Sequence, residues 1–299
     1  MAVLAQTWID ATRRNLLGTF TELRNTLSAN YTPGDGALTL SRSATNITPG
    51  TILSINLNTF YVWSVNGSVV TADGGQNGST DIALTSGAIV RVNPKFTDFD
   101  IWQELTNELG ALSGEGLVGY QSSDLTYNPV LTGYDLGSTA ASNLLDIYEV
   151  KYLTPGPEKD MPRLPRSAWR LTRNANTTDI ASGMGLQILS PSPQNVSGYT
   201  VRVVWKSTLP MPPTTATDLS TTLLQASAYD IPPIGAAINL MSGREVPRNF
   251  IQDQGDTRRA AEVPPGAIMQ STNGLKQRRQ SRIATEKARL ATMYAITAD

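Results

Sequence analysis

Residues 74–136 constrain the fold of this chain most, because they place helical and strand-like patterns directly next to each other. The stretch opens with the turn GGQNGST, which is followed by the short alternating strand AIVRV and the stop Asn93-Pro94. FTDFDIWQELTNELGAL then has the spacing of an amphipathic helix, and DLTYNPVLTGYDL returns to a strand pattern. We therefore expect a scaffold in which a helix passes between two β-rich regions.

Composition excludes several kinds of chemistry. The 299 residues include no cysteine and no histidine, so disulfides, thiol nucleophiles, thiolate zinc sites and imidazole bases are absent. A glycosidase needs only two carboxylates, for which the pairs Asp124 with Asp135 and Glu104 with Glu108 are candidates. We expect no enzyme activity and no cofactor. The net charge of −1 gives no overall attraction to nucleic acid, and no apolar run approaches the ~20 residues of a membrane helix.

The first third of the chain predicts a helix followed by a small β domain. Within residues 1–36, apolar positions recur with helical spacing over residues 5–28, and the Pro-Gly-Asp-Gly turn ends that pattern. Residues 37–93 change to short alternating strands, ALTLS, TILSINL, FYVWSV, SVVTA and AIVRV, separated by Asn-Gly and Gly-Gly turns. We expect a small antiparallel barrel inserted between two helices.

Residues 94–119 predict the second of these helices, over roughly residues 99–112. Thr97 or Asp98 is the expected N-cap. Acidic residues form the polar side of this helix, at Asp98, Asp100, Glu104 and Glu108. They are either an ordinary solvated face or, in a ring of identical copies, the lining of a tunnel whose negative charge lets DNA slide without sticking.

Residues 120–210 read as a second all-β unit, a β-sandwich of jelly-roll character. Its expected strands lie near LTY, YDL, LLDIYEVKYL, AWRLTR, GLQILS and YTVRVVWKS. Trp169, Tyr199 and Trp205 alternate with charged residues along these strands. They either pack in the core or form an aromatic platform for carbohydrate.

Residues 211–299 predict helices over 218–229, 234–242 and about 266–292, after a proline-rich hinge. The last helix is basic, through Lys276, Arg278, Arg279, Arg282, Lys287 and Arg289. Three interpretations remain open for it: a solvated amphipathic helix, an arm that docks into an acidic groove of a partner, or a nucleic-acid patch.

The order of these elements resembles the head-to-tail adaptor (connector, neck) proteins of tailed bacteriophages. The resemblance lies in the turn Gly78, Ser79 and Thr80, in the strand of residues 87–94 ending in Asn-Pro, and in the acidic helix 98–112. The strand of residues 124–136 and the RIATEKARL pattern of the basic arm are also similar. The large β unit between Tyr120 and Pro210 departs from a minimal helical adaptor.

The resemblance implies a structural virion protein at the head-tail interface, made in the host cytoplasm. It would form a ring, of twelve copies, beneath the portal protein, extend the DNA channel and carry the next neck or tail protein. Genomic double-stranded DNA would pass through without sequence-specific contact, and the basic arm would dock into the portal. The expected fold is α+β: a helical adaptor core with an inserted small β-barrel, a larger β-sandwich and a C-terminal helical arm. The alternative function is a carbohydrate- or receptor-binding β-sandwich protein of a phage tail or neck appendage.

Overall fold

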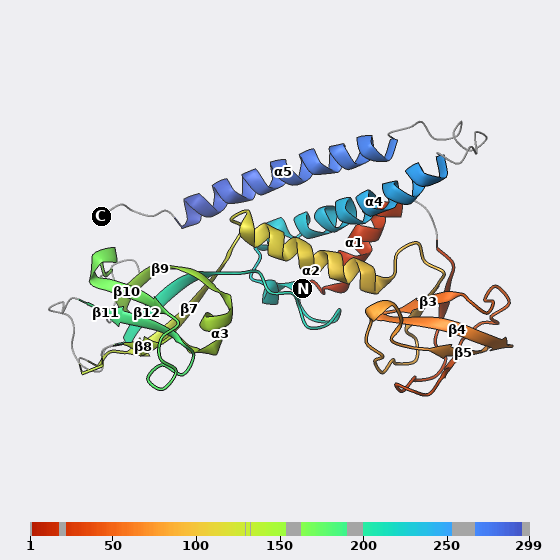
Figure 1. Cartoon of the computed structure of the whole chain (residues 1–299), viewed down its shortest axis with the longest axis horizontal. Helices are drawn as coiled ribbons and strands as arrows, with labels where there is room; N and C mark the ends of the chain where they lie inside the picture. Colours follow the sequence, from red (N-terminus) through yellow and green to blue (C-terminus); the bar gives the residue numbers. More distant parts are fainter. Residues whose placement is uncertain are drawn as a thin grey trace. The chain divides into compact units, whose positions relative to one another are not determined.

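A computed structural model describes residues 2–17, 22–128, 130–131, 133–153, 163–189, 200–252 and 267–294 of the chain. The fold is α+β, with long helices and mostly antiparallel sheets (Figure 1). The chain divides into two compact units. Unit 1 comprises Met1–Leu109, Met211–Thr221 and Gln225–Glu286, and unit 2 comprises Gly110–Pro210, Thr222–Leu224 and Lys287–Asp299.

Unit 1 contains the predicted small β domain. Its six strands are β1 (Arg24–Thr26), β2 (Ala37–Thr39), β3 (Ile52–Ile55), β4 (Asn58–Asn66), β5 (Val69–Asp73) and β6 (Ile89–Val92), paired antiparallel in the order β1-β6-β3-β4-β5-β2. The two edge strands meet at an antiparallel bridge between Leu27 and Leu40, so the sheet curls into a partly closed barrel. Fully buried side chains such as Leu38, Leu53 and Phe60 fill its interior.

The prediction of one long helix over residues 5–28 is wrong. The helix α1 spans Gln6–Leu17, and Arg24–Thr26 is the edge strand β1 of the barrel. Leu27, which fitted the helical spacing, is buried in the barrel core, and its N–H donates to Ala88 O at 3.0 Å. Pairing with β6 therefore overrides the local periodicity, and the β domain begins near residue 24 instead of 37.

The helix predicted after Asn93-Pro94 is confirmed and slightly longer, as α2 (Asp98–Gly114). Asn93 has a positive φ of 46°, which turns the chain out of β6. Thr97 is the N-cap: its Oγ1 accepts the N–H of Asp100 at 3.0 Å, and its own N–H donates to Asp100 Oδ2 at 3.0 Å. This reciprocal capping box satisfies two backbone N–H groups at the start of the helix.

The first two turns of helix α4 (Ile231–Gln252) are more deeply buried than any other described helical segment of unit 1. Residues 231–238 are all buried, and Pro232 and Pro233 fall in the first turn, where a missing N–H costs nothing. Trp8 of α1 donates its indole N–H to Tyr229 O at 2.8 Å just before α4 begins. The helix predicted over residues 218–229 is wrong: two 3₁₀ turns, Leu219–Thr222 and Ala226–Ala228, flank Leu223, whose φ is +62°.

Unit 2 is a sandwich of two three-stranded sheets. The strands are β7 (Gly119–Thr126), β8 (Tyr134–Asp135), β9 (Leu144–Leu153), β10 (Trp169–Arg173), β11 (Met184–Ile188) and β12 (Thr200–Ser207), with the short helix α3 (Gly137–Asn143) between β8 and β9. The orders are β10-β11-β8 and β7-β12-β9, and both sheets contribute to one core. A sandwich is confirmed, whereas a jelly roll has eight strands and the described part of unit 2 has six.

The aromatic residues of unit 2 pack inside the sandwich. Trp169 and Trp205 are 5% and 3% exposed, so neither can form a surface for a sugar ring. Arg166 stacks over the Trp169 ring at 4.0 Å. Tyr199 lies outside the described residues. The interpretation of the two tryptophans as core residues is therefore confirmed.

Candidate functional site

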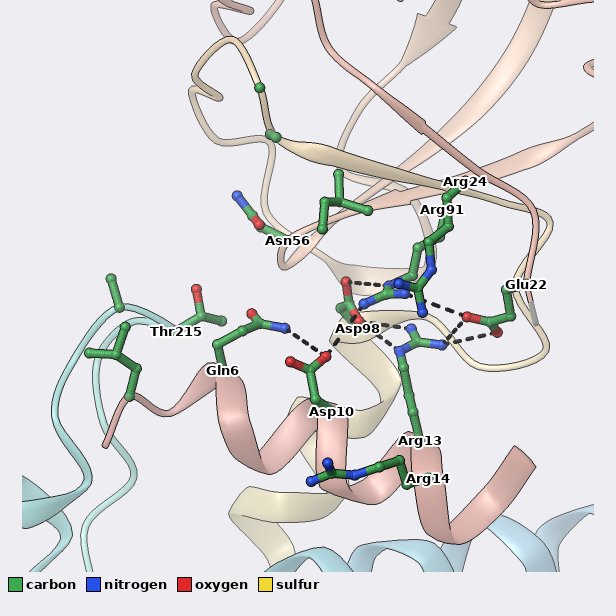
Figure 2. A pocket seen from close by; sticks show the side chains of 15 residues that line it. Gln6, Asp10, Arg13, Arg14, Glu22, Arg24, Asn56, Arg91, Asp98 and Thr215 are labelled. Carbon is green, nitrogen blue, oxygen red and sulfur yellow. Dashed lines mark hydrogen bonds and ion pairs between the residues drawn. The ribbon is translucent and has the colours of Figure 1, made fainter. Parts of the chain in front are cut away.

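An open cavity of about 680 Å³ lies in unit 1, where α1, the barrel and the start of α2 come together. Its lining is strongly charged, with four arginines and three carboxylates: Arg13, Arg14, Arg24, Arg91, Asp10, Glu22 and Asp98. Figure 2 shows that Arg13 points from α1 toward Glu22 and Asp98, while the neighbouring Arg14 extends away from these carboxylates.

Arg13 is the centre of the cavity's hydrogen-bond network. Its Nη1 donates to both oxygens of Glu22, at 3.0 and 2.8 Å, and its Nε and Nη2 donate to Asp98 Oδ1, at 3.1 and 2.7 Å. Nη2 also donates to Phe96 O at 2.8 Å. All three side chains are at most 6% exposed. The guanidinium therefore ties α1 to the barrel and to the first turn of α2.

Arg91 of β6 is the second buried cation of the cluster, with a side chain that is 4% exposed. It lies within ion-pairing distance of Asp10, Glu22 and Asp98, at 3.5, 3.7 and 3.5 Å. Its Nε and Nη1 nevertheless form no hydrogen bond. Arg91 thus balances charge in the cluster without the directional contacts that Arg13 makes.

The cavity's inner charges balance each other: two guanidinium groups face two buried carboxylates. Such a network contributes little net stability relative to apolar packing, but it is costly to break, because removing one partner leaves a buried charge uncompensated. It fixes how the barrel is held against the helices of unit 1. Neither buried carboxylate is free to act as a general base, since Glu22 and Asp98 each accept hydrogen bonds from Arg13.

The acidic residues of α2 do not form one exposed face. Asp98 is buried in the cavity network, and Asp100 is the capping partner of Thr97. Glu104 is half-buried and accepts from Asn239 Nδ2 of α4 at 3.1 Å. Glu108 is 4% exposed and paired with an arginine of α5. The interpretation as a solvated face is wrong for Asp98 and Glu108, because both are buried in unit 1.

The structure brings together two groups of predicted site residues, the acidic side of α2 and the basic helix α5 (Ala267–Met293). Arg279 Nε donates to Glu108 Oε1 at 2.6 Å, with side chains 14% and 4% exposed. The Glu108 carboxylate lies directly against Gly235 of α4, in space that a Cβ on residue 235 would occupy. Helices α2, α4 and α5 therefore meet at one buried carboxylate.

A second ion pair holds α5 one turn further along. Arg282 donates from Nε and Nη2 to both oxygens of Asp230, at 2.9 and 3.0 Å, and from Nη2 to Ser227 O at 2.6 Å. Hydrogen bonding to Asp230 is the main cause that raises the pKa of Arg282 above its usual range. We call Glu108, Asp230, Arg279 and Arg282 the α5 seam.

The remaining basic residues of the predicted arm do not take part in the seam. Lys276, Arg278 and Lys287 are exposed. Arg289 is half-buried, and its Nη1 lies 3.3 Å from Met293 Sδ. The solvated-helix interpretation therefore describes the outer side of α5, whereas Arg279 and Arg282 are engaged by unit 1.

Three of the four carboxylates considered for glycoside hydrolysis are held by neighbouring side chains. Asp124 of β7 is bound by Arg202 at 2.7 and 2.9 Å, and this contact lowers the pKa of Asp124. Asp135 of β8 accepts from Ser182, which lowers its pKa as well. A general acid at neutral pH needs a raised pKa, so neither residue suits that role. Glu108 is occupied by Arg279.

No cluster of three or more His, Cys, Asp or Glu side chains in the described part of the chain could hold a metal ion. No helix within the described ranges has the length and apolarity to cross a membrane.

Sequence reasoning missed the cavity network. Arg13 and Glu22 lie in the stretch of residues 5–28 that predicts one long helix, where a solvated role is the default for charged residues. Arg91 stands in the strand AIVRV, between two valines. A charge in the middle of a short apolar strand is the one local signal that could have indicated a buried ion pair.

Comparison with models of known protein families gave no match, and no curated protein matches the chain.

Proposed function

We propose that this protein is a head-to-tail adaptor of a tailed bacteriophage, a structural virion protein that forms a ring beneath the portal and connects the capsid to the tail. The observation that carries the proposal is the way helices and β modules alternate. One β module lies on the connection from α1 to α2, and the other on the connection from α2 to α4. A helical core with two β modules offers separate surfaces to successive neighbours in a ring and along a tail axis.

The charged side chains of unit 1 support a scaffold rather than a catalyst. The cavity network and the α5 seam pair each buried carboxylate with an arginine, which rigidifies contacts between elements. In the proposed ring, DNA passes through the channel without sequence-specific contact. Asp98 and Glu108 are no longer assigned to the channel wall, because they are buried; Asp100 and Glu104, which are half-buried, keep that assignment.

The portal-binding surface of the proposed adaptor is the outer side of α5. Lys276 and Arg278 are exposed on its two flanks, because they are two residues apart in the helix, and neither forms an ion pair with another described residue. Free cations on a rigid helix suit an acidic groove on a partner, where they contribute to the association rate and to specificity. Exposed Lys287 extends the same basic pattern.

A binding assay with the portal of the same phage tests this function. The purified chain is mixed with portal rings, and the complex is imaged by negative-stain electron microscopy and sized by mass photometry. We expect a second ring on one end of the portal, and we expect K276E/R278E to weaken its capture. The control R42E/R170E reverses two exposed arginines outside α5 and should bind normally. A wild-type chain that never associates with the portal would contradict the proposal.

A further inference from the structure

The surface that receives α5 is built by other elements of unit 1. Glu108 projects from α2, and the glycine at position 235 gives its carboxylate room beside α4. Asp230 lies between the 3₁₀ turn Ala226–Ala228 and the start of α4, where the Ser227 carbonyl accepts from the same arginine. The acceptor groups are thus positioned by the body of the unit, independently of the helix that binds them.

The attachment of α5 to unit 1 is mainly polar. Among residues 270–286, the buried side chains are Thr272, Ile283 and Glu286, of which only Ile283 is large and apolar. In α4, by contrast, eight consecutive residues, 231–238, are buried. Since apolar burial is the dominant force that holds elements together, α5 can separate from unit 1 without opening its core.

The α5 seam gives this attachment its specificity. Arg279 and Arg282 are three residues apart and therefore lie on one side of the helix. Arg279 binds Glu108, and Arg282 binds Asp230 with two parallel hydrogen bonds. Only arginine has the planar group that forms such a pair with a carboxylate, so this geometry selects arginine over lysine. The surface fits a basic helix with cations at this spacing. A second copy of the chain carries such a helix.

We propose that the Glu108 and Asp230 surface of one copy binds α5 of a second copy, so that exchanged α5 helices link neighbouring copies. This inference rests on the proposed ring and specifies how its copies are joined. An exchanged helix makes the same contacts as a helix bound within its own chain, so exchange requires no additional complementary surface. Within one isolated copy the tethered helix has the advantage of high effective concentration, and exchange is favoured where a ring holds the copies close together.

Charge reversal across Arg282 and Asp230 tests the exchange directly. The variants D230K and R282E each place like charges opposite each other within one chain. In an equimolar mixture, favourable pairs form only between copies: arginine with aspartate in one direction, and glutamate with lysine in the other. The double variant D230K/R282E restores opposite charges within one chain. Its α5 protection measures whether the reversed pair is tolerated next to Glu286, which Arg282 also contacts at 3.3 Å. R42E, an equal charge reversal at an exposed residue outside α5, is the control.

Ring formation by mass photometry and hydrogen exchange of the α5 amides are measured for each sample. We expect each single variant to lose α5 protection by about tenfold or more, because a charged hydrogen-bonded pair is broken, and to lose rings. The mixture should recover both, and R42E should keep both. Single variants that assemble like the wild type, or a mixture that recovers neither property, would overturn the exchange.

A second measurement uses the wild-type chain and so does not depend on the folding of any variant. Copies labelled with nitrogen-14 and nitrogen-15 are mixed during assembly and treated with an amine-to-carboxylate cross-linker. Linked peptides joining α5 to α2 or to the start of α4 should contain both isotopes. Rings whose links contain one isotope only would leave the adaptor proposal intact and overturn the exchange. Absence of rings together with mixed-isotope links in smaller oligomers would overturn the ring and support the exchange.

Discussion

The carboxylate of Glu108 lies in the space where a Cβ on Gly235 would stand. A side chain at position 235 would overlap this carboxylate, so Glu108 keeps its place only beside glycine. The same carboxylate accepts a hydrogen bond from Arg279 at 2.6 Å, so a single side chain of α2 contacts both α4 and α5. A charge that is 4% exposed is stable here because its partner is in direct contact with it.

Gly235→Ala should therefore destabilise unit 1. The added methyl group overlaps the Glu108 carboxylate, which must move away from Arg279 or push α4 aside. We expect a loss of about 1–3 kcal/mol in the free energy of unfolding, as for other overpacked positions, measured by urea denaturation. Gly110→Ala in α2 is the matched control, because nothing lies within 4 Å of its added methyl group and the helix gains propensity. Equal effects of the two substitutions would argue against this contact.

Breaking the cavity network should cost more than removing a charge at its edge. Glu22→Gln leaves the two buried guanidinium groups of Arg13 and Arg91 with one buried carboxylate, Asp98, between them. Because one buried positive charge is then uncompensated, we expect a loss of about 3–5 kcal/mol in unfolding free energy. Asp10 has a 51% exposed side chain and lies 3.5 Å from Arg91. Asp10→Asn should change stability by less than about 1 kcal/mol. Thermal denaturation of both variants gives the comparison. A large loss for Asp10→Asn together with a small loss for Glu22→Gln would show that Asp10, and not Glu22, is the main counter-charge of the arginines.

The capping box of α2 predicts a smaller, local effect. Thr97→Ala removes the oxygen that accepts the Asp100 N–H, and we expect a loss of about 1 kcal/mol. Thr106 is exposed in the same helix, and its hydroxyl binds only Trp102 O of the preceding turn among the described contacts. Thr106→Ala should be neutral or slightly stabilising, since alanine favours helix. Guanidinium denaturation followed by circular dichroism distinguishes the two.

Ionisation of Tyr31 should destabilise the barrel in alkaline solution. Burial, and next the hydrogen bond to Asp81, raise the pKa of Tyr31 from 10.0 to about 12. The unfolded chain releases this proton from about pH 10, whereas the folded chain keeps it until about pH 12. The contribution of Tyr31 is therefore fully present below pH 10 and is lost as the pH rises toward 12.

Tyr31→Phe isolates this contribution from that of the other tyrosines. We expect the difference in unfolding free energy between wild type and Tyr31→Phe to shrink by roughly 1–3 kcal/mol between pH 9 and pH 12. A difference that stays constant across this range would show that Tyr31 titrates normally in the folded chain. Denaturant unfolding at a series of pH values supplies the data.

The strand and helix patterns of residues 37–112 were predictable because each is local. Alternating residues pack inside the barrel, and the Thr97 capping box follows from side chains three residues apart. The β1 strand was not predictable in the same way. Leu27 matches a helical spacing, but pairing of β1 with the distant strand β6 places it in the barrel core. Likewise Leu223 needs a positive φ that its sequence does not signal.

The site was predictable only in its parts. Glu108 and Arg279 both stood out in the sequence, one in an acidic helix and the other in a basic helix. Their pairing spans 171 positions, and the contact of the Glu108 carboxylate with Gly235 of α4 that accompanies it exists only in the folded chain. Arg13, Glu22 and Arg91 come from separate elements in the same way, so spacing along the chain could not have joined them.

Cryo-electron microscopy of the phage particle that carries this protein tests the central claim most directly. The neck is averaged first with ring symmetry imposed and then with that symmetry relaxed. The adaptor proposal predicts that this chain traces into a closed ring directly beneath the portal, with the outer side of α5 against the portal surface. A neck ring built by another chain, with this protein located in a fibre or missing from the particle, would contradict it.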